Sequence, residues 1–172
     1  MKLSPFFYIV LCMLGLAASP QAGAASAALR PMLTVDPTAR YKVVYDIHSA
    51  EMAAGVSKGL FYARGLIEAY GKQGVKPDQL DIHLVLHGGA AQFLLIDETY
   101  QKAVNDPFAV NTSAKITQDL LGLGVQVEIC HSVMKSKGWT PEDVLPGVVM
   151  VHDGYTRLIK LQNEGYAYLG GF

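Results

Sequence analysis

The chain has 172 residues with 14 basic and 15 acidic side chains, so its formal net charge is −1. A charge balance of this kind leaves no electrostatic footprint for nucleic acid or an anionic membrane surface, and we expect neither as a partner. The hydrophobic content of 51% suits a globular α/β domain once the apolar first segment is set aside.

The first two dozen residues have the pattern of a cleavable signal peptide. Lys2 precedes an apolar run over residues 6–18, and small residues with Ala-x-Ala spacing follow. The run is short for a membrane span, so we expect no stable membrane anchor. The sequence predicts a signal peptide over residues 1–24, with cleavage after Ala24 or Ala27, and a periplasmic or secreted location.

Cysteine usage in the remaining chain is unusual for an exported protein. Of the two cysteines, Cys12 leaves with the signal peptide and Cys130 stays. A single cysteine cannot form an internal disulfide, so its thiol is free, pairs with another molecule or binds a ligand. Residues 25–40 contain two prolines and little periodicity, and we predict an N-terminal extension there, followed by one domain over residues 41–172.

The first half of that domain begins with an alternating apolar strand over residues 41–48. Ser49 is a plausible N-cap for a helix to about Tyr70, because apolar residues recur at helical spacing from Met52 onward. Glycines in this helix lower its propensity and allow close packing on the sheet or on another subunit. A second strand over residues 81–87 is closed by Gly88 and Gly89, and a helix is expected near Ala90.

The second half repeats the alternation of helix and strand. It comprises a helix capped by Asn111 or Thr112, a strand over 125–130, a short helix to Gly138, a helix start at 140–143, a strand over 148–152, a helix from Asp153 to Gly165 and a strand over 166–169. Strands that alternate with helices form βαβ units. We therefore predict an α/β fold with a mainly parallel central sheet of about five strands and helices on both faces.

The strand that ends in Cys130 carries the first candidate for chemistry. Its residues alternate, with Val125, Val127 and Ile129 on one face and Glu128 and Cys130 on the other. Ligands bind at the carboxyl edge of open α/β sheets, and a helix that starts there favours a thiolate. The alternative is that Cys130 is simply a small buried hydrophobic residue.

Four of the five histidines follow the same pattern. His48, His87 and His152 each end a predicted strand, and His131 follows Cys130. In a parallel sheet these positions share one edge, which would carry the thiol and up to four imidazoles. For each histidine taken alone, the sequence favours a capping or solvated polar residue. His83 lies in mid-strand, where we expect a hydrogen-bonded or exposed imidazole without a role in the site.

Two further features at this edge leave alternatives open. Gly88 and Gly89 either form a turn or bind an anion through their N–H groups. Glu128 either disfavours the Cys130 thiolate by like charge or holds an imidazole in place. The sequence favours the turn for the glycines and does not decide for Glu128.

Three segments together resemble the DsrE/DsrF sulfur-oxidation and sulfur-relay family. They are His87-Gly88 after the second strand, the strand ending in Cys130, and residues 158–168 with their Gln162–Tyr166 run. The resemblance spans about Tyr41 to Leu169. It implies a compact DsrEFH-like α/β sandwich, a homo-oligomer, and a cysteine that carries sulfane sulfur as a persulfide, for which Cys130 is the one position. The best-understood relatives are cytoplasmic, so their donors, acceptors and tRNA thiolation are not expected for an exported chain.

The function predicted from these features is an exported sulfur carrier or sulfurtransferase that holds a persulfide on Cys130. His131 would stabilise the thiolate. His87, Gly88 and Gly89 would line the pocket, together with three further positions of the same edge: His48, Glu128 and His152. We expect no cofactor, and as partners a donor or acceptor protein or a small sulfur species. The sequence does not distinguish a carrier from a multiple-turnover enzyme.

Two other functions use the same residues. A thiolate and several imidazoles suit zinc or copper, although no compact ligand spacing such as C-x-x-C occurs in the sequence. The edge could also serve an oligomeric interaction module without chemistry, in which Cys130 would have ordinary reactivity.

Overall fold

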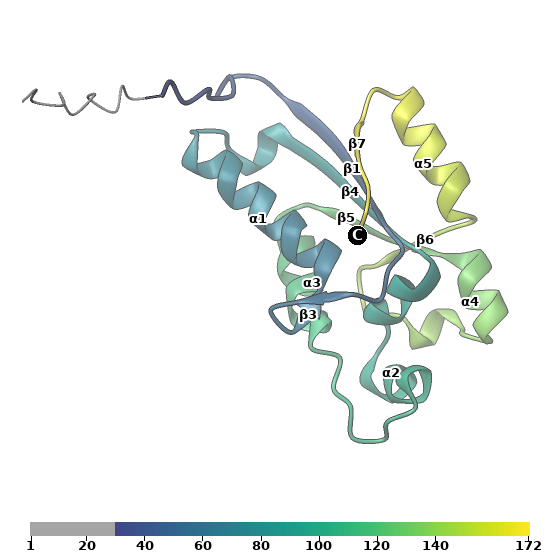
Figure 1. Ribbon diagram of the computed structural model, residues 1–172. Helices are drawn as coiled ribbons and strands as arrows, with labels where there is room; N and C mark the ends of the chain where they lie inside the picture. Colours follow the sequence, from purple (N-terminus) through teal and green to yellow (C-terminus); the bar gives the residue numbers. More distant parts are fainter. Residues whose placement is uncertain (1–29) are drawn as a thin grey trace, which may run out of the picture. The chain divides into compact units, whose positions relative to one another are not determined.

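The structure is a computed structural model that describes residues 30–172, so the predicted signal peptide and its cleavage sites lie outside the described residues. Five parallel strands form one sheet in the order β6-β5-β4-β1-β7 (Figure 1). They are β1 (Tyr41–Ile47), β4 (Leu80–Leu86), β5 (Gln126–Cys130), β6 (Val149–Val151) and β7 (Ala167–Leu169). The predicted α/β fold with a parallel sheet of about five strands is confirmed.

Helices cover both faces of the sheet, and the handedness of the connections explains which helix lies where. The chain steps in one direction from β1 through β4 and β5 to β6, and right-handed crossovers then place their helices on one face. The step from β6 to β7 runs back across the sheet, so the same rule places its helix on the other face. The first face carries α1 (Lys58–Lys72), α2 (Asp97–Val104), α3 (Ser113–Gly122) and α4 (His131–Lys137), and the second carries α5 (Gly154–Asn163).

At the carboxyl edge of the sheet, the connections that leave β5 and β6 lead to opposite faces. The chain that leaves β5 enters α4, whose Met134 packs in the core of the first face. The chain that leaves β6 enters α5, whose Leu158 packs on the second face. Adjacent strands whose connections lead to opposite faces define the point where α/β sheets bind ligands. Cys130 ends β5 at this point, and His152 directly follows β6.

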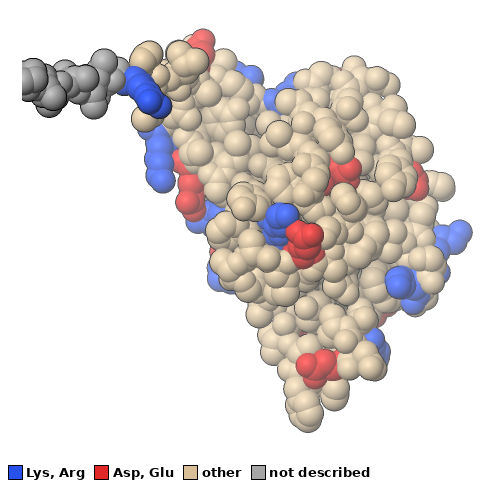
Figure 2. All heavy atoms as spheres, in the orientation of Figure 1, with Lys and Arg blue, Asp and Glu red and all other residues tan. Residues whose placement is uncertain are grey.

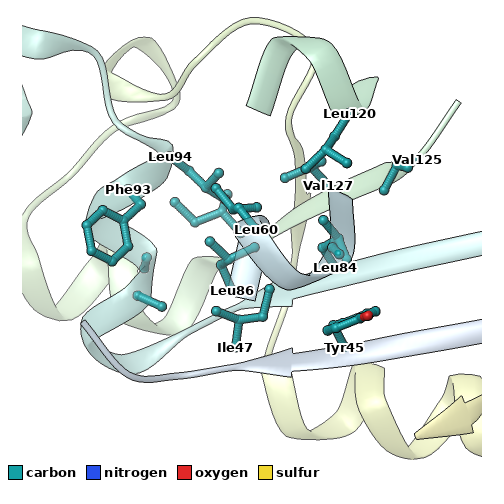
Figure 3. Packing of buried hydrophobic residues seen from close by; sticks show 14 of the residues in the cluster. Tyr45, Ile47, Leu60, Leu84, Leu86, Phe93, Leu94, Leu120, Val125 and Val127 are labelled. Atoms are coloured by element: carbon teal, nitrogen blue, oxygen red, sulfur yellow. The ribbon is translucent and has the colours of Figure 1, made fainter. Parts of the chain in front are cut away.

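The two faces of the sheet have different compositions. On the first face, apolar side chains from the strands pack against α1, α3 and the 3₁₀ helix η2 (Gly88–Leu94), as Figure 3 shows for Leu84, Leu86, Leu60, Leu120 and Phe93. The apolar cluster under α5 consists of Val44, Val85, Leu158 and Leu161. Strand alternation places the buried polar side chains of β1, β4 and β5, and of His87 directly after β4, on this second face: Asp46, His83, His87, Glu128 and Cys130.

The helix predicted from Ser49 onward begins later than expected. Residues 52–57 form an antiparallel hairpin of β2 (Met52–Ala53) and β3 (Val56–Ser57), and α1 starts at Lys58. Ala54 and Gly55 between the strands both have positive φ, 51° and 81°, as a type I′ turn requires. The prediction was wrong here because Met52 and Val56 are four residues apart, a spacing that also fits a helix.

Two other predicted helices differ in the structure. The helix near Ala90 is the 3₁₀ helix η2. The start at Thr140 has its capping box, but only the 3₁₀ turn η3 (Pro141–Asp143) follows before Pro146. A short 3₁₀ turn, η1 (Pro77–Gln79), precedes β4. The last residues of the predicted extension contact this turn, because the Gln79 side chain donates to the carbonyls of Pro37 and Ala39, at 2.9 Å each.

Two glycines of α1 should respond oppositely to alanine. A Cβ on Gly59 would lie 2.6 Å from two carbons of the buried, β-branched Ile47, whereas a Cβ on Gly65 would meet nothing within 4 Å. We expect Gly59→Ala to lower the free energy of unfolding by about 1–3 kcal/mol through overpacking. Gly65→Ala should raise it by about 0.5–1 kcal/mol. Urea denaturation of both variants checks the pair, and equal effects would contradict the close packing of α1 on β1.

Candidate functional site

Cys130 lies where β5 ends and α4 begins, and its thiol is covered by the start of α5. The residue is 3% exposed, and the N–H of Gly154 donates to its Sγ at 3.3 Å. Gly154 is the first residue of the ten-residue helix α5, whose leading N–H groups have no acceptor within the helix. The sulfur thus receives one of these donors at the amino-terminal end of α5.

The donor to Cys130 comes from a different helix than the sequence predicted. We expected the helix after Cys130, which is α4, to stabilise the thiolate, but the Cys130 side chain makes no capping hydrogen bond to it. The start of α5 is held instead by Asp153, whose side chain accepts from the N–H of Thr156 at 3.0 Å. This cap fixes the helix turn from which Gly154 reaches the sulfur.

His87 lies next to the same glycine. A Cβ built on Gly154 would lie 3.1 Å from Cβ and Cγ of His87, so only a residue without a side chain lets α5 approach the imidazole this closely. His87 is buried, its Nε2 lies 2.7 Å from Oδ1 of Asp46, and the ring of Tyr155 meets it edge-on at 4.9 Å. Gly154 therefore lies between the thiol on one side and the imidazole–carboxylate pair on the other.

Asp46 is the residue of this site that sequence reasoning missed. Its Oδ2 accepts from the hydroxyl of Tyr168 at 2.6 Å, and its Oδ1 lies 3.8 Å from Nδ1 of His48. The hydrogen bond to Asp46, together with partial burial, raises the pKa of Tyr168 to about 12. The signal was the alternation of Val44, Asp46 and His48, which puts a carboxylate on the same strand face as a candidate histidine.

The four histidines of the edge divide into two pairs. His48 and His87 lie together, with ring centroids 5.9 Å apart. His131 and His152 are exposed, and within residues 30–172 no hydrogen bond or ion pair joins either side chain to Cys130, His48 or His87. His152 acts through its backbone, because its carbonyl accepts from the hydroxyl of Ser132 at 3.0 Å. The predicted effect of His131 on the thiolate stays a prediction.

The sequence predicted that Gly88 and Gly89 line a pocket together with His87. In the structure, His87 is not part of the cavity that the two glycines line. They line a cavity of about 340 Å³ with Gln92, Lys102, Ala103, Lys137 and Trp139. His87 instead faces α5, on the opposite side of the sheet. Gly88 has φ +53°, and a Cβ there would lie 3.0 Å from the carbonyl oxygen of His48, so the glycine permits a tight turn beside β1.

Glu128 belongs to a buried ion pair that holds α5 on the sheet. The carboxylate is 1% exposed and accepts from Nε and Nη2 of Arg157, at 2.6 and 2.7 Å, while Nδ1 of His83 lies 2.5 Å away. Burial alone would raise the pKa of Glu128, but the hydrogen bonds from Arg157 and His83 outweigh it and lower that pKa. Of the two alternatives for Glu128, the structure shows the second, since the carboxylate holds the His83 imidazole.

The Glu128–Arg157 pair connects the two elements that form the thiol site. Glu128 lies two residues before Cys130 on the same face of β5, and Arg157 lies three residues after Gly154 on α5. The pair therefore fixes how α5 approaches β5, and with it the position of the Gly154 N–H relative to the sulfur. Both carboxylate oxygens of Glu128 are already bonded to Arg157 or His83, so Glu128 is not available to bind a ligand.

Fold and site together define a class: an α/β protein with a parallel sheet and a single thiol at its carboxyl edge. The chain belongs to the DsrE/DsrF-like family, whose model matches residues 34–170. No curated protein matches the chain.

Two solved structures share the fold. A protein of unknown function from Methanobacterium thermoautotrophicum, MTH1491, is 21% identical with a TM-score of 0.57, and the match covers 76% of this chain and 99% of that one. The ychN protein from E. coli is 18% identical with a TM-score of 0.55 and the same coverage, 76% and 99%. The DsrEFH-like fold expected from the sequence is thereby confirmed.

The structure shows the charge distribution on one face of the molecule and the membrane-spanning potential of the described helices. On the face shown in Figure 2, basic and acidic residues are scattered between wide uncharged areas. Among the helices of residues 30–172, none combines the length and the apolar character needed to cross a bilayer.

Proposed function

We propose that this protein is an exported sulfane-sulfur carrier that holds a persulfide on Cys130 and passes it to a sulfur-relay partner. The observation that carries the proposal is the hydrogen bond from the first N–H of α5 to the Cys130 sulfur, at the point where the sheet edge opens. Membership of the DsrE/DsrF-like family supports a role related to sulfur relay.

The chemistry requires two exchanges at sulfur. The Cys130 thiolate attacks the outer sulfur of a donor persulfide or polysulfide, a new S–S bond forms, and the donor's S–S bond breaks. A persulfide donor leaves as a thiolate, and a polysulfide leaves as the anion that is one sulfur atom shorter. An acceptor thiolate then attacks the outer sulfur on Cys130, which returns to the thiolate. Each exchange transfers one neutral sulfur atom, so no external oxidant or reductant is needed. The Gly154 N–H offers a hydrogen bond to the anionic sulfur at the beginning and end of the cycle.

Burial of the thiol restricts the donor. Cys130 is 3% exposed, so a donor must reach a sulfur that the start of α5 covers. A small polysulfide anion meets less obstruction there than a persulfide on a folded protein. We therefore propose a small sulfane-sulfur species as donor, and a partner thiol as acceptor that engages once the sulfur is loaded.

The test is the intact mass of the purified protein before and after polysulfide treatment. We expect a gain of whole sulfur atoms that a reductant removes, and an unchanged mass would contradict the proposal. The same spectrum tests export, because cleavage after Ala24 or Ala27 defines the mass of the mature chain. Native mass spectrometry reads the number of subunits and so tests the homo-oligomer that we also propose.

A further inference from the structure

We propose that Asp46, His48 and His87 form a binding site for a divalent first-row transition metal ion, and that Cys130 is not among its ligands. One ligand atom from each of the three residues lies within 4.8 Å of the other two. Two imidazoles and one carboxylate are a common protein ligand set for such ions, with further positions left to water or to an exogenous ligand.

The polar groups around Asp46 lack a permanent cation among the described residues, which gives the first argument. Its carboxylate is buried at 9% exposure, and its polar side-chain partners among the described residues are His87, His48 and Tyr168. None of these is a permanent cation. The buried Glu128 on the same face, in contrast, is paired with Arg157. Buried carboxylates are normally paired with a cation or coordinate a metal, and a bound ion would supply the missing positive charge.

The positions of the ligand atoms give the second argument. Oδ1 of Asp46 lies 2.7 Å from Nε2 of His87 and 3.8 Å from Nδ1 of His48. Zinc bonds of about 2.0–2.2 Å to nitrogen and oxygen bring tetrahedral ligand atoms roughly 3–3.5 Å apart. The two measured distances, 2.7 and 3.8 Å, therefore lie on either side of the separation that zinc requires. The His48 side chain is 53% exposed and can close the remaining gap by rotation.

The surrounding contacts orient the ligands as metal sites usually do. The Tyr168 hydroxyl donates to Oδ2 of Asp46, which leaves Oδ1 directed at the imidazoles. The backbone of His48 is held on both sides, since its N–H donates to the Phe172 carbonyl at 2.9 Å and its carbonyl accepts from Ala90 at 3.2 Å. Rigid backbone and an oriented carboxylate limit the reorganisation that binding requires.

Cys130 is separated from this site by Gly154, which contacts the sulfur on one side and His87 on the other. The metal proposal therefore does not depend on sulfur transfer, and it differs from a site that uses the thiolate as a ligand. It gives His48 and His87 a common role that His131 and His152 do not share.

The experiment is titration of the purified protein with Zn²⁺ by calorimetry and with Co²⁺ by visible absorption. We expect saturable binding of about one ion per chain, retained in Cys130→Ser and without a thiolate-to-cobalt charge-transfer band. His48→Ala should weaken binding at least tenfold, and this exposed position makes loss of the fold an improbable cause, which circular dichroism checks. Tyr168→Phe should weaken it about tenfold by releasing Asp46.

The matched controls are His131→Ala and His152→Ala, which remove exposed histidines of the same edge and should leave the affinity unchanged. Three results would overturn the proposal: no saturable binding by the wild type, equal affinity in His48→Ala, or loss of binding in Cys130→Ser. The last would identify the thiolate as a ligand instead. Failure of sulfur loading, measured separately by mass, would leave the metal result unaffected.

Discussion

Replacing Glu128 by glutamine is expected to lower the free energy of unfolding by about 3 kcal/mol. The carboxylate is almost fully buried and receives two hydrogen bonds from Arg157. Removal of the buried carboxylate leaves the partly buried Arg157 guanidinium, 22% exposed, without its partner, which costs more than an exposed pair contributes. Urea denaturation followed by circular dichroism measures the difference.

The matched control is Glu98→Gln. Glu98 also forms an ion pair, with Lys102, but both side chains are more than two-thirds exposed, at 75% and 71%. Exposed pairs one helical turn apart contribute about 0.3–0.5 kcal/mol, so this variant should stay close to the wild type. A Glu128→Gln variant as stable as Glu98→Gln would show that Arg157 does not anchor α5.

The same ion pair makes stability depend on acid pH. The pKa of Glu128 is lower in the folded protein than its ordinary value, because hydrogen bonds from Arg157 and His83 outweigh burial. Its contribution is therefore fully present above the unfolded pKa of about 4.3 and is lost as the pH falls through the lower folded value. We expect the stability difference between wild type and Glu128→Gln to be constant near neutral pH and to narrow below about pH 4. Denaturation curves over that range test this.

The parts of the fold that followed from the sequence are those with local causes. Alternation in 41–47 and 126–130, glycines after the helices and the Asp153 cap are all local signals, and the strands and α5 lie where they predict. The 52–57 hairpin could not be separated from a helix start because the turn depends on Ala54 in a left-handed conformation. Few sequence signals indicate that conformation for alanine.

The sequence predicted where the site lies in the fold, at the carboxyl edge of the sheet, but not which groups contact one another there. A parallel sheet brings His48, His87 and Cys130 to one edge, and this followed from the strand ends. The Gly154 N–H reaches Cys130 only because α5 returns across the opposite face, which the order of elements along the chain does not reveal. Asp46 was missed because its proximity to His87 depends on the pairing of β1 with β4.

Two buried carboxylates, Glu128 and Asp46, lie on the face of the sheet under α5, and their partners differ. The partners indicate a structural role for Glu128 and support the ligand-binding role proposed for Asp46. Glu128 is neutralised by Arg157 and holds α5 in place. Asp46 faces two imidazoles and a phenol, without a permanent cation. The amphipathic helix α5 thus covers the thiol and also supplies its hydrogen-bond donor.

Replacing Cys130 by serine should abolish sulfur loading, since the hydroxyl is not a nucleophile toward sulfane sulfur under the same conditions and no second cysteine lies in the described chain. The serine oxygen can still accept the Gly154 N–H, so the fold should be retained, with a stability change of about 1 kcal/mol or less. Intact mass after polysulfide treatment, with and without reductant, measures the loading.

The controls for this variant are Cys12→Ser and Ser132→Ala. Cys12→Ser should load like the wild type even where the first segment is uncleaved, because the proposal places the sulfur on Cys130 alone. Ser132→Ala alters the exposed neighbour of Cys130 that bonds to the His152 carbonyl, and should also load. Sulfur uptake by Cys130→Ser would end the carrier proposal. If the folded wild-type protein takes up no sulfur on Cys130, the hydrogen bond from Gly154 to Cys130 has a structural role alone.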